Sequence, residues 1–179
     1  MHETPAELRS LQALIDVSAE RAGAHQASII TGERRLDAGD TVRYLQGSKH
    51  LVVATTTRDG QPRASAADGL FLHGSFWFST SGQSFKARHL AVRPAVSVAH
   101  VRGDDIAFFV HGTARMLSGD DPAADPLKPL WREVYDGSCP DDWCDTPADA
   151  RYVQVVASTF VTYCFDRARF EALTQEDSR

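Results

Sequence analysis

The sequence predicts a mainly β domain with flanking helices, in which the strands form an antiparallel barrel. About six or seven short segments rich in β-branched and aromatic residues follow one another from His50 to Phe165. Turn signals such as Arg58-Asp59-Gly60 and Arg102-Gly103-Asp104 separate these segments. Because few helical segments lie between them, an antiparallel barrel is favoured over a parallel, doubly wound sheet.

A helix and an arm are expected over residues 1–39, ahead of a barrel at residues 40–179 within a single domain. Residues 4–7, Thr-Pro-Ala-Glu, form a capping box with proline at the first helical position. Apolar residues then repeat at three- and four-residue steps over residues 8–22, which predicts a helix. Residues 23–39 carry no strong pattern, so a linker or a partly extended arm is expected there.

The other elements follow from capping residues, turn signals and alternation. A second helix is expected to start with Asp40 as its cap and to end at Gly47, which can supply a left-handed turn. Strands are expected at residues 50–57, 61–67, 70–80, 95–101 and 105–116, and as a closing hairpin or one bent strand at 151–165. Short helices are expected at residues 84–92, 130–135 and 167–173, and loops at 118–129 and 137–149.

Composition and charge narrow the classes of function. The 179 residues are 42% hydrophobic, as in an ordinary globular domain, and the net charge of -5 gives no reason to expect a nucleic-acid surface. No signal peptide or membrane span is recognisable, so a cytoplasmic protein without a membrane partner is expected. Cys139, Cys144 and Cys164 lack zinc-ligand spacing, and the seven histidines form no ligand motif. We therefore expect reduced thiols and no metal site.

The most informative residues lie where a predicted strand passes into a short helix. Ser79 and Thr80 place hydroxyls at the strand end, Ser84 can cap the helix, and Lys86 falls in its first turn. A helix N-terminus attracts anions, and added hydroxyls with one ammonium are typical of a phosphate site. The sequence has 16 arginines but only three lysines, which makes the lysine at this position notable. From spacing alone, an ordinary turn with a solvated lysine is an equal alternative.

An ordered series of segments between about residues 40 and 118 resembles the pyridoxamine-phosphate-oxidase-like split barrels. The segments are Leu51–Thr55, Asp59–Arg63, Phe76–Thr80, Ser84–Leu90, Arg93–Ser97 and His111–Ala114. The resemblance implies a six-stranded antiparallel split β-barrel that forms a homodimer. It also implies that FMN or the deazaflavin F-420 binds in clefts between the two subunits.

In that family a Ser-x-Lys pair at the helix start and a threonine ending the preceding strand bind the cofactor phosphate. The resemblance assigns these roles to Ser84, Lys86 and Thr80. An arginine of the oxidases proper falls near Ser65, where this sequence has none, and Arg63 on the same strand face is the candidate substitute. The expected cofactor-binding residues are Lys86, Ser84, Thr80, Ser79, Arg63, Ser65 and Arg88. No residue stands out as an obligatory catalytic acid or base.

The expected function is that of a flavin-type oxidoreductase, which transfers a hydride to or from a small organic substrate. One alternative is a non-catalytic protein that binds a cofactor, haem or another ligand. Another is pyridoxamine or pyridoxine phosphate oxidase, against which the missing arginine near Ser65 argues. The choice between FMN and F-420 stays open. The arginine- and alanine-rich composition mildly favours F-420, whose acidic tail would need basic residues such as Arg43, Lys49 and Arg88.

Residues 135–143 resemble a loop of some uncharacterised members of the family, which can cover the site. The favoured interpretation of Trp131 and Trp143 is that they are packing aromatics.

Overall fold

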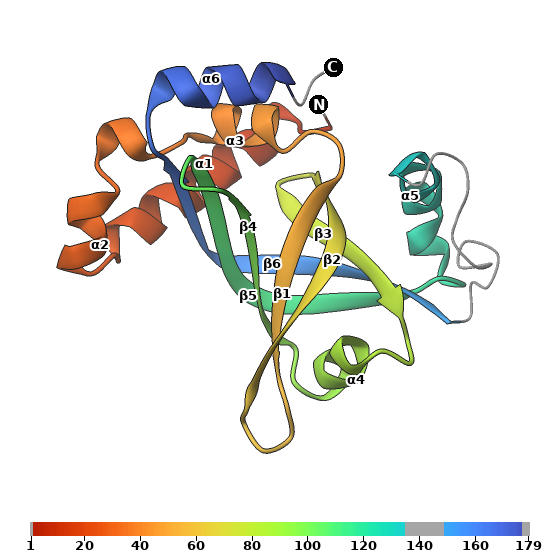
Figure 1. Ribbon diagram of the computed structural model, residues 1–179. Coiled ribbons are helices and arrows are strands. Elements are labelled where there is room, and N and C mark those ends of the chain that lie inside the picture. Colours follow the sequence, from red (N-terminus) through yellow and green to blue (C-terminus); the bar gives the residue numbers. More distant parts are fainter. Residues whose placement is uncertain (1, 135–148, 177–179) are drawn as a thin grey trace.

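A closed six-stranded antiparallel barrel forms the centre of the computed structural model, which describes residues 2–134 and 149–176 (Figure 1). The strands neighbour one another in the order β1-β2-β3-β6-β5-β4. Their bounds are β1 Lys49–Thr56, β2 Pro62–Leu72, β3 Ser75–Ser81, β4 Ala95–Arg102, β5 Ile106–Ser118 and β6 Ala150–Cys164. The predicted fold class is therefore confirmed.

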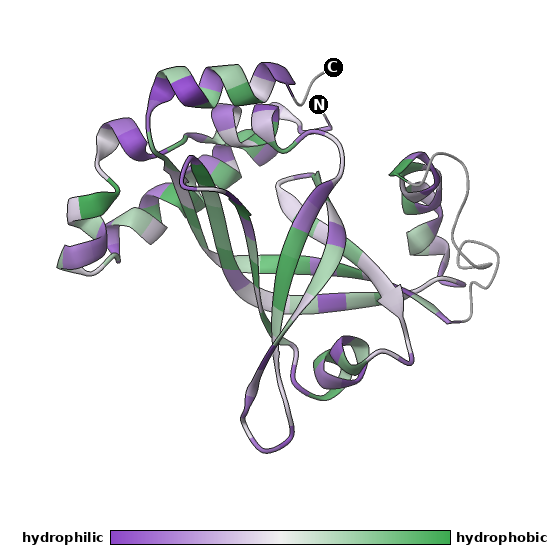
Figure 2. Ribbon diagram, in the orientation of Figure 1, coloured by the Kyte–Doolittle hydropathy of each residue, from purple (hydrophilic) through white to green (hydrophobic). Residues whose placement is uncertain are grey.

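Alternation along the strands separates the barrel interior from its outer face. In β1, Leu51 and Val53 are buried while Val52 between them is 51% exposed. Phe76 and Phe78 of β3 point into the same core, where the Phe76 ring stacks on that of Phe160. Figure 2 shows apolar green segments along the strands, alternating with paler and polar ones, whereas the tip of the β1–β2 hairpin is polar. Burial of these apolar side chains is the main force that closes the barrel.

The segment expected as a hairpin or one bent strand is a single strand, β6, with a register shift opposite His111 and Gly112 of β5. A Cβ at Gly112 would lie 2.1 Å from the carbonyl oxygen of Val156, so no other residue fits this irregularity without a backbone shift. β6 pairs with β3 over residues 150–154, and beyond them its described partner is β5.

The N-terminal helix packs on the part of β6 that β3 leaves open. Helix α1, Pro5–Glu20, starts with the predicted capping box at Thr4 and Glu7. Its Leu11 and Ile15 are buried in the same hydrophobic core as the barrel strands. The hydroxyl oxygen of Ser18 accepts a hydrogen bond of 2.9 Å from the backbone N–H of Phe160 on β6. The first 39 residues thus contribute directly to the barrel core.

Two predictions for the segment ahead of the barrel need correction. The arm contains a short helix α2, Ala24–Ile29, and a 3-10 turn η1, Gly32–Arg34, rather than extended chain. Helix α3, Ala38–Tyr44, begins three residues earlier than expected, because the cap is Asp37, whose carboxylate accepts from the N–H of Asp40. Gly47 has the expected positive φ of 70°.

The expected loop at residues 118–129 contains a second 3-10 turn, η2, Pro122–Leu127, which leads directly into helix α5, Lys128–Val134. Asp121 caps η2, and Leu127 packs with buried Trp131 in a small apolar cluster, which confirms the packing role of this tryptophan. Trp143, Cys139 and Cys144 lie outside the described residues.

Helix α4, Phe85–Val92, lies at one end of the barrel and helix α6, Arg167–Glu176, closes the other, together with α3 (Figure 1). None of the described helices is long and apolar enough to span a membrane.

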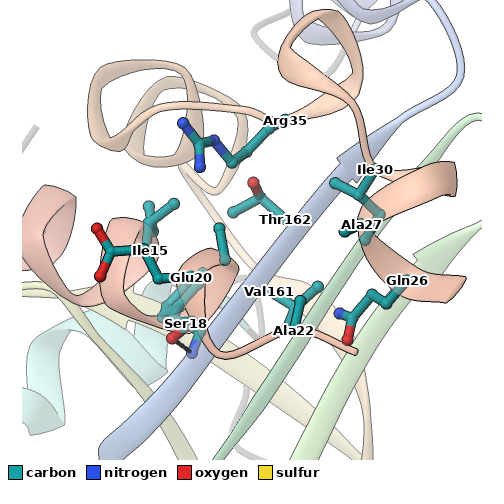
Figure 3. Close-up of a pocket in the computed structure, with 12 residues that line it drawn as sticks. Ile15, Ser18, Glu20, Ala22, Gln26, Ala27, Ile30, Arg35, Val161 and Thr162 are labelled. Carbon is teal, nitrogen blue, oxygen red and sulfur yellow. Dashed lines mark hydrogen bonds between the residues drawn. The ribbon is translucent and has the colours of Figure 1, made fainter. Parts of the chain in front are cut away.

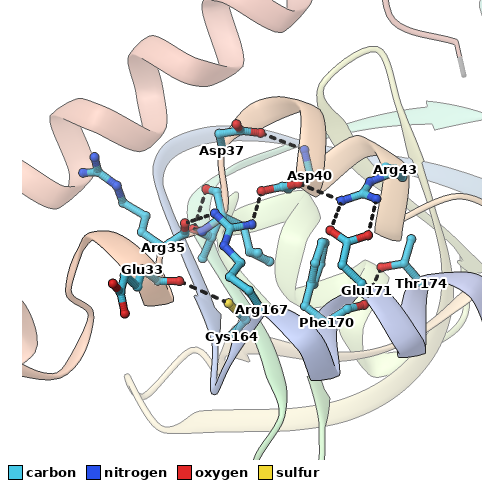
Figure 4. Close-up of polar contacts among 12 residues, drawn as sticks. Glu33, Arg35, Asp37, Asp40, Arg43, Cys164, Arg167, Phe170, Glu171 and Thr174 are labelled. Atoms are coloured by element: carbon cyan, nitrogen blue, oxygen red, sulfur yellow. Dashed lines mark hydrogen bonds and ion pairs between the residues drawn. The ribbon is translucent and has the colours of Figure 1, made fainter.

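A network of charged side chains fixes α6 to α3 (Figure 4). Arg43 of α3 donates to both carboxylate oxygens of Glu171 at 2.6 and 2.7 Å, and to Asp40 at 2.9 Å. Arg167 at the start of α6 also donates to Asp40. Burial alone raises the pKa of the Asp40 carboxyl, but the hydrogen bonds and charges of Arg167 and Arg43 outweigh it and lower this pKa.

Replacing Asp40 with asparagine removes the negative charge that pairs with Arg43 and Arg167. The free energy of unfolding should fall by about 1 kcal/mol at pH 7, and the loss is this small because both arginines are partly exposed and water screens their charges. Since the folded-state pKa lies below the unfolded one, this contribution is present above the unfolded pKa of about 3.9 and disappears as pH falls through the folded pKa. Urea unfolding at pH 7 and pH 3 measures the difference, with Asp59→Asn in the exposed β1–β2 turn as the control. An Asp40→Asn penalty of equal size at both pH values would contradict this role.

Candidate functional site

A pocket of about 570 Å³ lies between helix α4 and the protruding β1–β2 hairpin. In Figure 1 this region is at the end of the barrel opposite to α3 and α6. The residues that line the pocket are Thr55, Thr57, Arg63, Ala64, Ser65, Ser84, Phe85, Lys86 and His89. Four of the seven predicted cofactor-binding residues are among them.

The pocket forms where the barrel splits between β2 and β3. These strands pair only over Gly69–Leu72 and Ser75–Phe78. Residues 62–68 of β2 continue to pair with β1, but their other edge has no strand partner in the described part of the chain. Such an edge presents backbone N–H and C=O groups to whatever lies beside it. Here α4 lies beside it.

Ser84 organises the start of α4. Its hydroxyl oxygen accepts from the N–H of Ala87 at 3.1 Å, as the predicted helix cap, and from the hydroxyl of Thr80 at 3.0 Å. Thr80 is 4% exposed and lies at the end of β3, so a buried residue of this strand holds the Ser84 side chain in position. Because both bonds use Ser84 as acceptor, its own hydroxyl proton is available to a ligand. The N–H groups of a first helical turn also lack intrahelical partners.

Lys86 bridges α4 and the open edge of β2. Its ammonium donates a hydrogen bond of 2.6 Å to the carbonyl oxygen of Ala66. Burial lowers the pKa of Lys86, and the charge of nearby Asp68 offsets part of this shift. Within residues 2–134 and 149–176, no carboxylate lies within ion-pair distance of this ammonium. A half-buried cation whose partner is a neutral carbonyl would gain from a bound anion.

Arg63 and Ser65 occupy the same face of β2 and both line the pocket, as their spacing of two residues predicts. The Arg63 guanidinium is exposed and donates to the carbonyl of Pro62 and the side chain of Gln61. It can therefore reorient toward a ligand at low cost.

Ser79 and Arg88 are not among the residues that line the pocket. Ser79 neighbours Thr80 along β3, so its side chain points to the opposite face of the strand, beside Tyr152 of β6. Arg88 is exposed, with its guanidinium 4.8 Å from the centre of the Phe85 ring. Whether either residue contacts a cofactor stays a prediction.

Arg43 and Lys49, expected to follow the groove, lie elsewhere. Arg43 is held in the α3–α6 network. Lys49 is 6% exposed, and its ammonium lies 5.0 Å from the centre of the Tyr44 ring. Both basic groups are engaged in packing helices onto the far end of the barrel, so this expectation was wrong.

Five residues that line the pocket were not predicted from the sequence: Thr55, Thr57, Ala64, Phe85 and His89. The Thr55 hydroxyl and Nδ1 of His89 are hydrogen-bonded at 2.9 Å, which ties α4 to β1. His89 follows Lys86 by three residues, one helical turn, so the helix period alone could have placed both on one face. Phe85 is 75% exposed at the pocket edge. The position of Phe85 as the first residue of α4 places it at the pocket, whereas its residue type alone gives no such indication.

Comparison with known families decides the classification. A family model described as pyridoxamine 5'-phosphate oxidase matches residues 40–163, more than half of the chain. The chain belongs to this family. All the pocket residues fall within the matched segment of this pyridoxamine 5'-phosphate oxidase family member. No curated protein matches the sequence.

Solved structures share the fold of this pyridoxamine 5'-phosphate oxidase family member at low sequence identity. A conserved hypothetical protein from Mycobacterium tuberculosis is 23% identical, with a TM-score of 0.61, over 75% of this chain and 88% of that one. An F420 reductase is 23% identical, with a TM-score of 0.52, over 65% and 92%. The haem storage protein HutZ from Vibrio cholerae is 16% identical, with a TM-score of 0.59, over 75% and 99%. These likenesses support the barrel fold.

Proposed function

We propose that this protein binds FMN or the deazaflavin F-420 and transfers a hydride to or from a small organic substrate. The observation that carries the proposal is the half-buried Lys86 ammonium at the mouth of a pocket, whose hydrogen-bond partner among the described residues is a backbone carbonyl. Both cofactors carry a phosphate, and the start of α4 offers this ammonium, the Ser84 hydroxyl and first-turn N–H groups to it.

The protein residues have distinct roles in this proposal. Lys86 and Ser84 bind the phosphate, while Thr80 holds the Ser84 hydroxyl in place from inside the barrel. Arg63 and Ser65 add polar contacts from the open edge of β2. Thr55 engages Nδ1 of His89, which leaves Nε2 as the ring nitrogen for a ligand. The bound ring system supplies the hydride chemistry, and the protein orients it and excludes water.

The two cofactors make different demands beyond the phosphate. The acidic tail of F-420 needs cations along its path. Arg43, Lys49 and Arg88 were expected along the path of this tail, and of these three Arg88 lies on α4, next to the pocket. FMN needs no such path, so a direct titration with both cofactors distinguishes them.

A homodimer is part of the proposal. Val52 of β1, Ala99 of β4 and Phe109 of β5 are neighbours in register and form an apolar row across the outer face of the barrel. Val52 is 51% and Phe109 39% exposed. Ala64 of β2 lies on this same face, opposite Ala54, and also lines the pocket. A second copy that covers the row would therefore lie at the edge of the cofactor site.

The second candidate is a non-catalytic binding protein, because a haem storage protein shares this fold at a TM-score of 0.59. Purified protein loaded with FMN or F-420 should exchange reducing equivalents with at least one small substrate of a panel, followed by the cofactor absorbance under anaerobic conditions. Tight haem binding together with failure of both redox cofactors to bind would favour the storage role instead.

Replacing Lys86 with methionine keeps the length of the side chain but removes its charge. FMN or F-420 affinity should fall by roughly 1.5 to 3 kcal/mol, because one charge-assisted phosphate contact is lost. Calorimetric titration measures this, with Lys128→Met in α5 as the matched control, since Lys128 instead pairs with Asp125. Equal affinity of wild type and Lys86→Met would refute the anchor assignment.

Replacing Phe109 with glutamate places a charge in the middle of the proposed dimer face. Sedimentation should change from a dimer to a monomer, and cofactor affinity should fall at the same time, because the pocket lies beside this face. Phe165→Glu is the control, since Phe165 is also exposed but lies after β6, outside the row. A Phe109→Glu protein that stays dimeric would rule out this surface as the interface.

A further inference from the structure

A second pocket lies on the other side of the molecule, between the C-terminal part of α1, helix α2 and strand β6 (Figure 3). Its volume is about 260 Å³, the space of roughly nine molecules of liquid water. None of the residues that line it belongs to the α4 pocket. It is therefore a separate site.

The hollow exists because α2 stands away from the barrel. None of the side chains of α2 is buried, although the helix follows α1 after a short turn. Ala19, Ala22 and Ala27 line the space with methyl groups, and small side chains of this kind cannot fill it. Buried Ile15 and Phe160 form its floor. The interior of the pocket is thus apolar and suited to a hydrocarbon group.

Hydrogen bonds fix the frame of this pocket on both sides. Ser18 accepts from the Phe160 N–H and donates to the carbonyl of Leu14 at 2.7 Å. The Thr162 hydroxyl accepts from the N–H of Leu36 at 3.0 Å and donates to its carbonyl at 2.8 Å. These hydroxyls already use their donors within the protein, so they add little polarity to the floor. The walls that α1 and β6 contribute to the pocket are therefore held in place by the protein itself.

Two opposite charges lie at the rim. Figure 3 shows Arg35 and Glu20 on one side of the pocket, across from Ala27 and Ile30. Arg35 makes a long ion pair of 3.7 Å with Asp16, and both side chains are well exposed, so this contact is weak. In the described part of the chain, Glu20 has neither an ion pair nor a hydrogen bond from its side chain.

We propose that this pocket binds a free apolar α-amino acid such as leucine. The α-carboxylate would pair with the Arg35 guanidinium, which suits a planar two-oxygen anion. The α-ammonium would pair with the Glu20 carboxylate, and the hydrocarbon side chain would enter the apolar space beneath. A monocarboxylate would leave Glu20 unpaired, and a simple amine would leave Arg35 without a better partner. A zwitterion alone satisfies both charges, and the proposal does not depend on the function of the α4 pocket.

Calorimetric titration of the full-length protein with leucine, leucinamide, N-acetylleucine and glycine tests the proposal. Leucine should bind at least about tenfold more tightly than each of the other three, because each lacks one of the three matched groups. Arg35→Gln and Glu20→Gln should each weaken leucine binding by about tenfold. Both residues are at the surface, so the variants should fold, and Arg9→Gln on the exposed face of α1 is the matched control.

Affinities that are equal for leucine, leucinamide and N-acetylleucine would overturn the proposal, as would the absence of leucine binding in the millimolar range. An unchanged leucine affinity in Arg35→Gln and Glu20→Gln would overturn it too. FMN titration of the same variants should give wild-type affinity. This keeps the outcome distinct from that of the α4 pocket.

Discussion

The ammonium of Lys86, half-buried against the carbonyl oxygen of Ala66, is the contact on which the account of this molecule depends. Burial disfavours the charge, and the neutral Ala66 carbonyl together with the nearby charge of Asp68 compensates this only in part. An anion is therefore expected to bind favourably beside this ammonium. Thr80 and Ser84 complete the corner with a hydroxyl pair that also caps α4. Charge, cap and pocket meet at one point.

This corner exists because β2 and β3 pair along only part of their length. If β2 and β3 paired along their full length, the carbonyl of Ala66 would be used within the sheet and α4 could not approach it. Pairing stops at Gly69 and Phe78, and the chain leaves β3 to form α4 beside the open edge. The exit is tightly packed, since a Cβ at Gly82 would lie 3.1 Å from the Arg151 guanidinium and 3.2 Å from the carbonyl oxygen of Asp149. The site is thus a consequence of the topology and not an addition to it.

The sequence predicted the parts of the structure that local chemistry determines. The capping box at Thr4, the Ser84 cap and the positive φ of Gly47 follow from residue type and spacing, and all three are present. The cap of α3 was misplaced because Asp37 and Asp40 are both good capping residues, and only the folded chain selects between them. Local signals of equal strength cannot be ranked without tertiary contacts.

At the site, the residues found in advance were those that share a strand or helix start, such as Ser84 and Lys86. Thr55 was missed because it reaches the pocket only through the pairing of β1 with β2 and a contact across to His89. Arg43 was assigned to the groove on charge alone, but it forms an ion pair with Glu171, which lies 128 residues further along the chain. Contacts of such long sequence separation carry no local signal.

A crystal structure of the protein with bound FMN or F-420 tests the central claim most directly. We expect a phosphate oxygen within about 3 Å of the Lys86 ammonium and of the Ser84 hydroxyl. The ammonium would turn from the Ala66 carbonyl toward that oxygen. A cofactor whose phosphate lies elsewhere, with Lys86 still bound to Ala66, would contradict it.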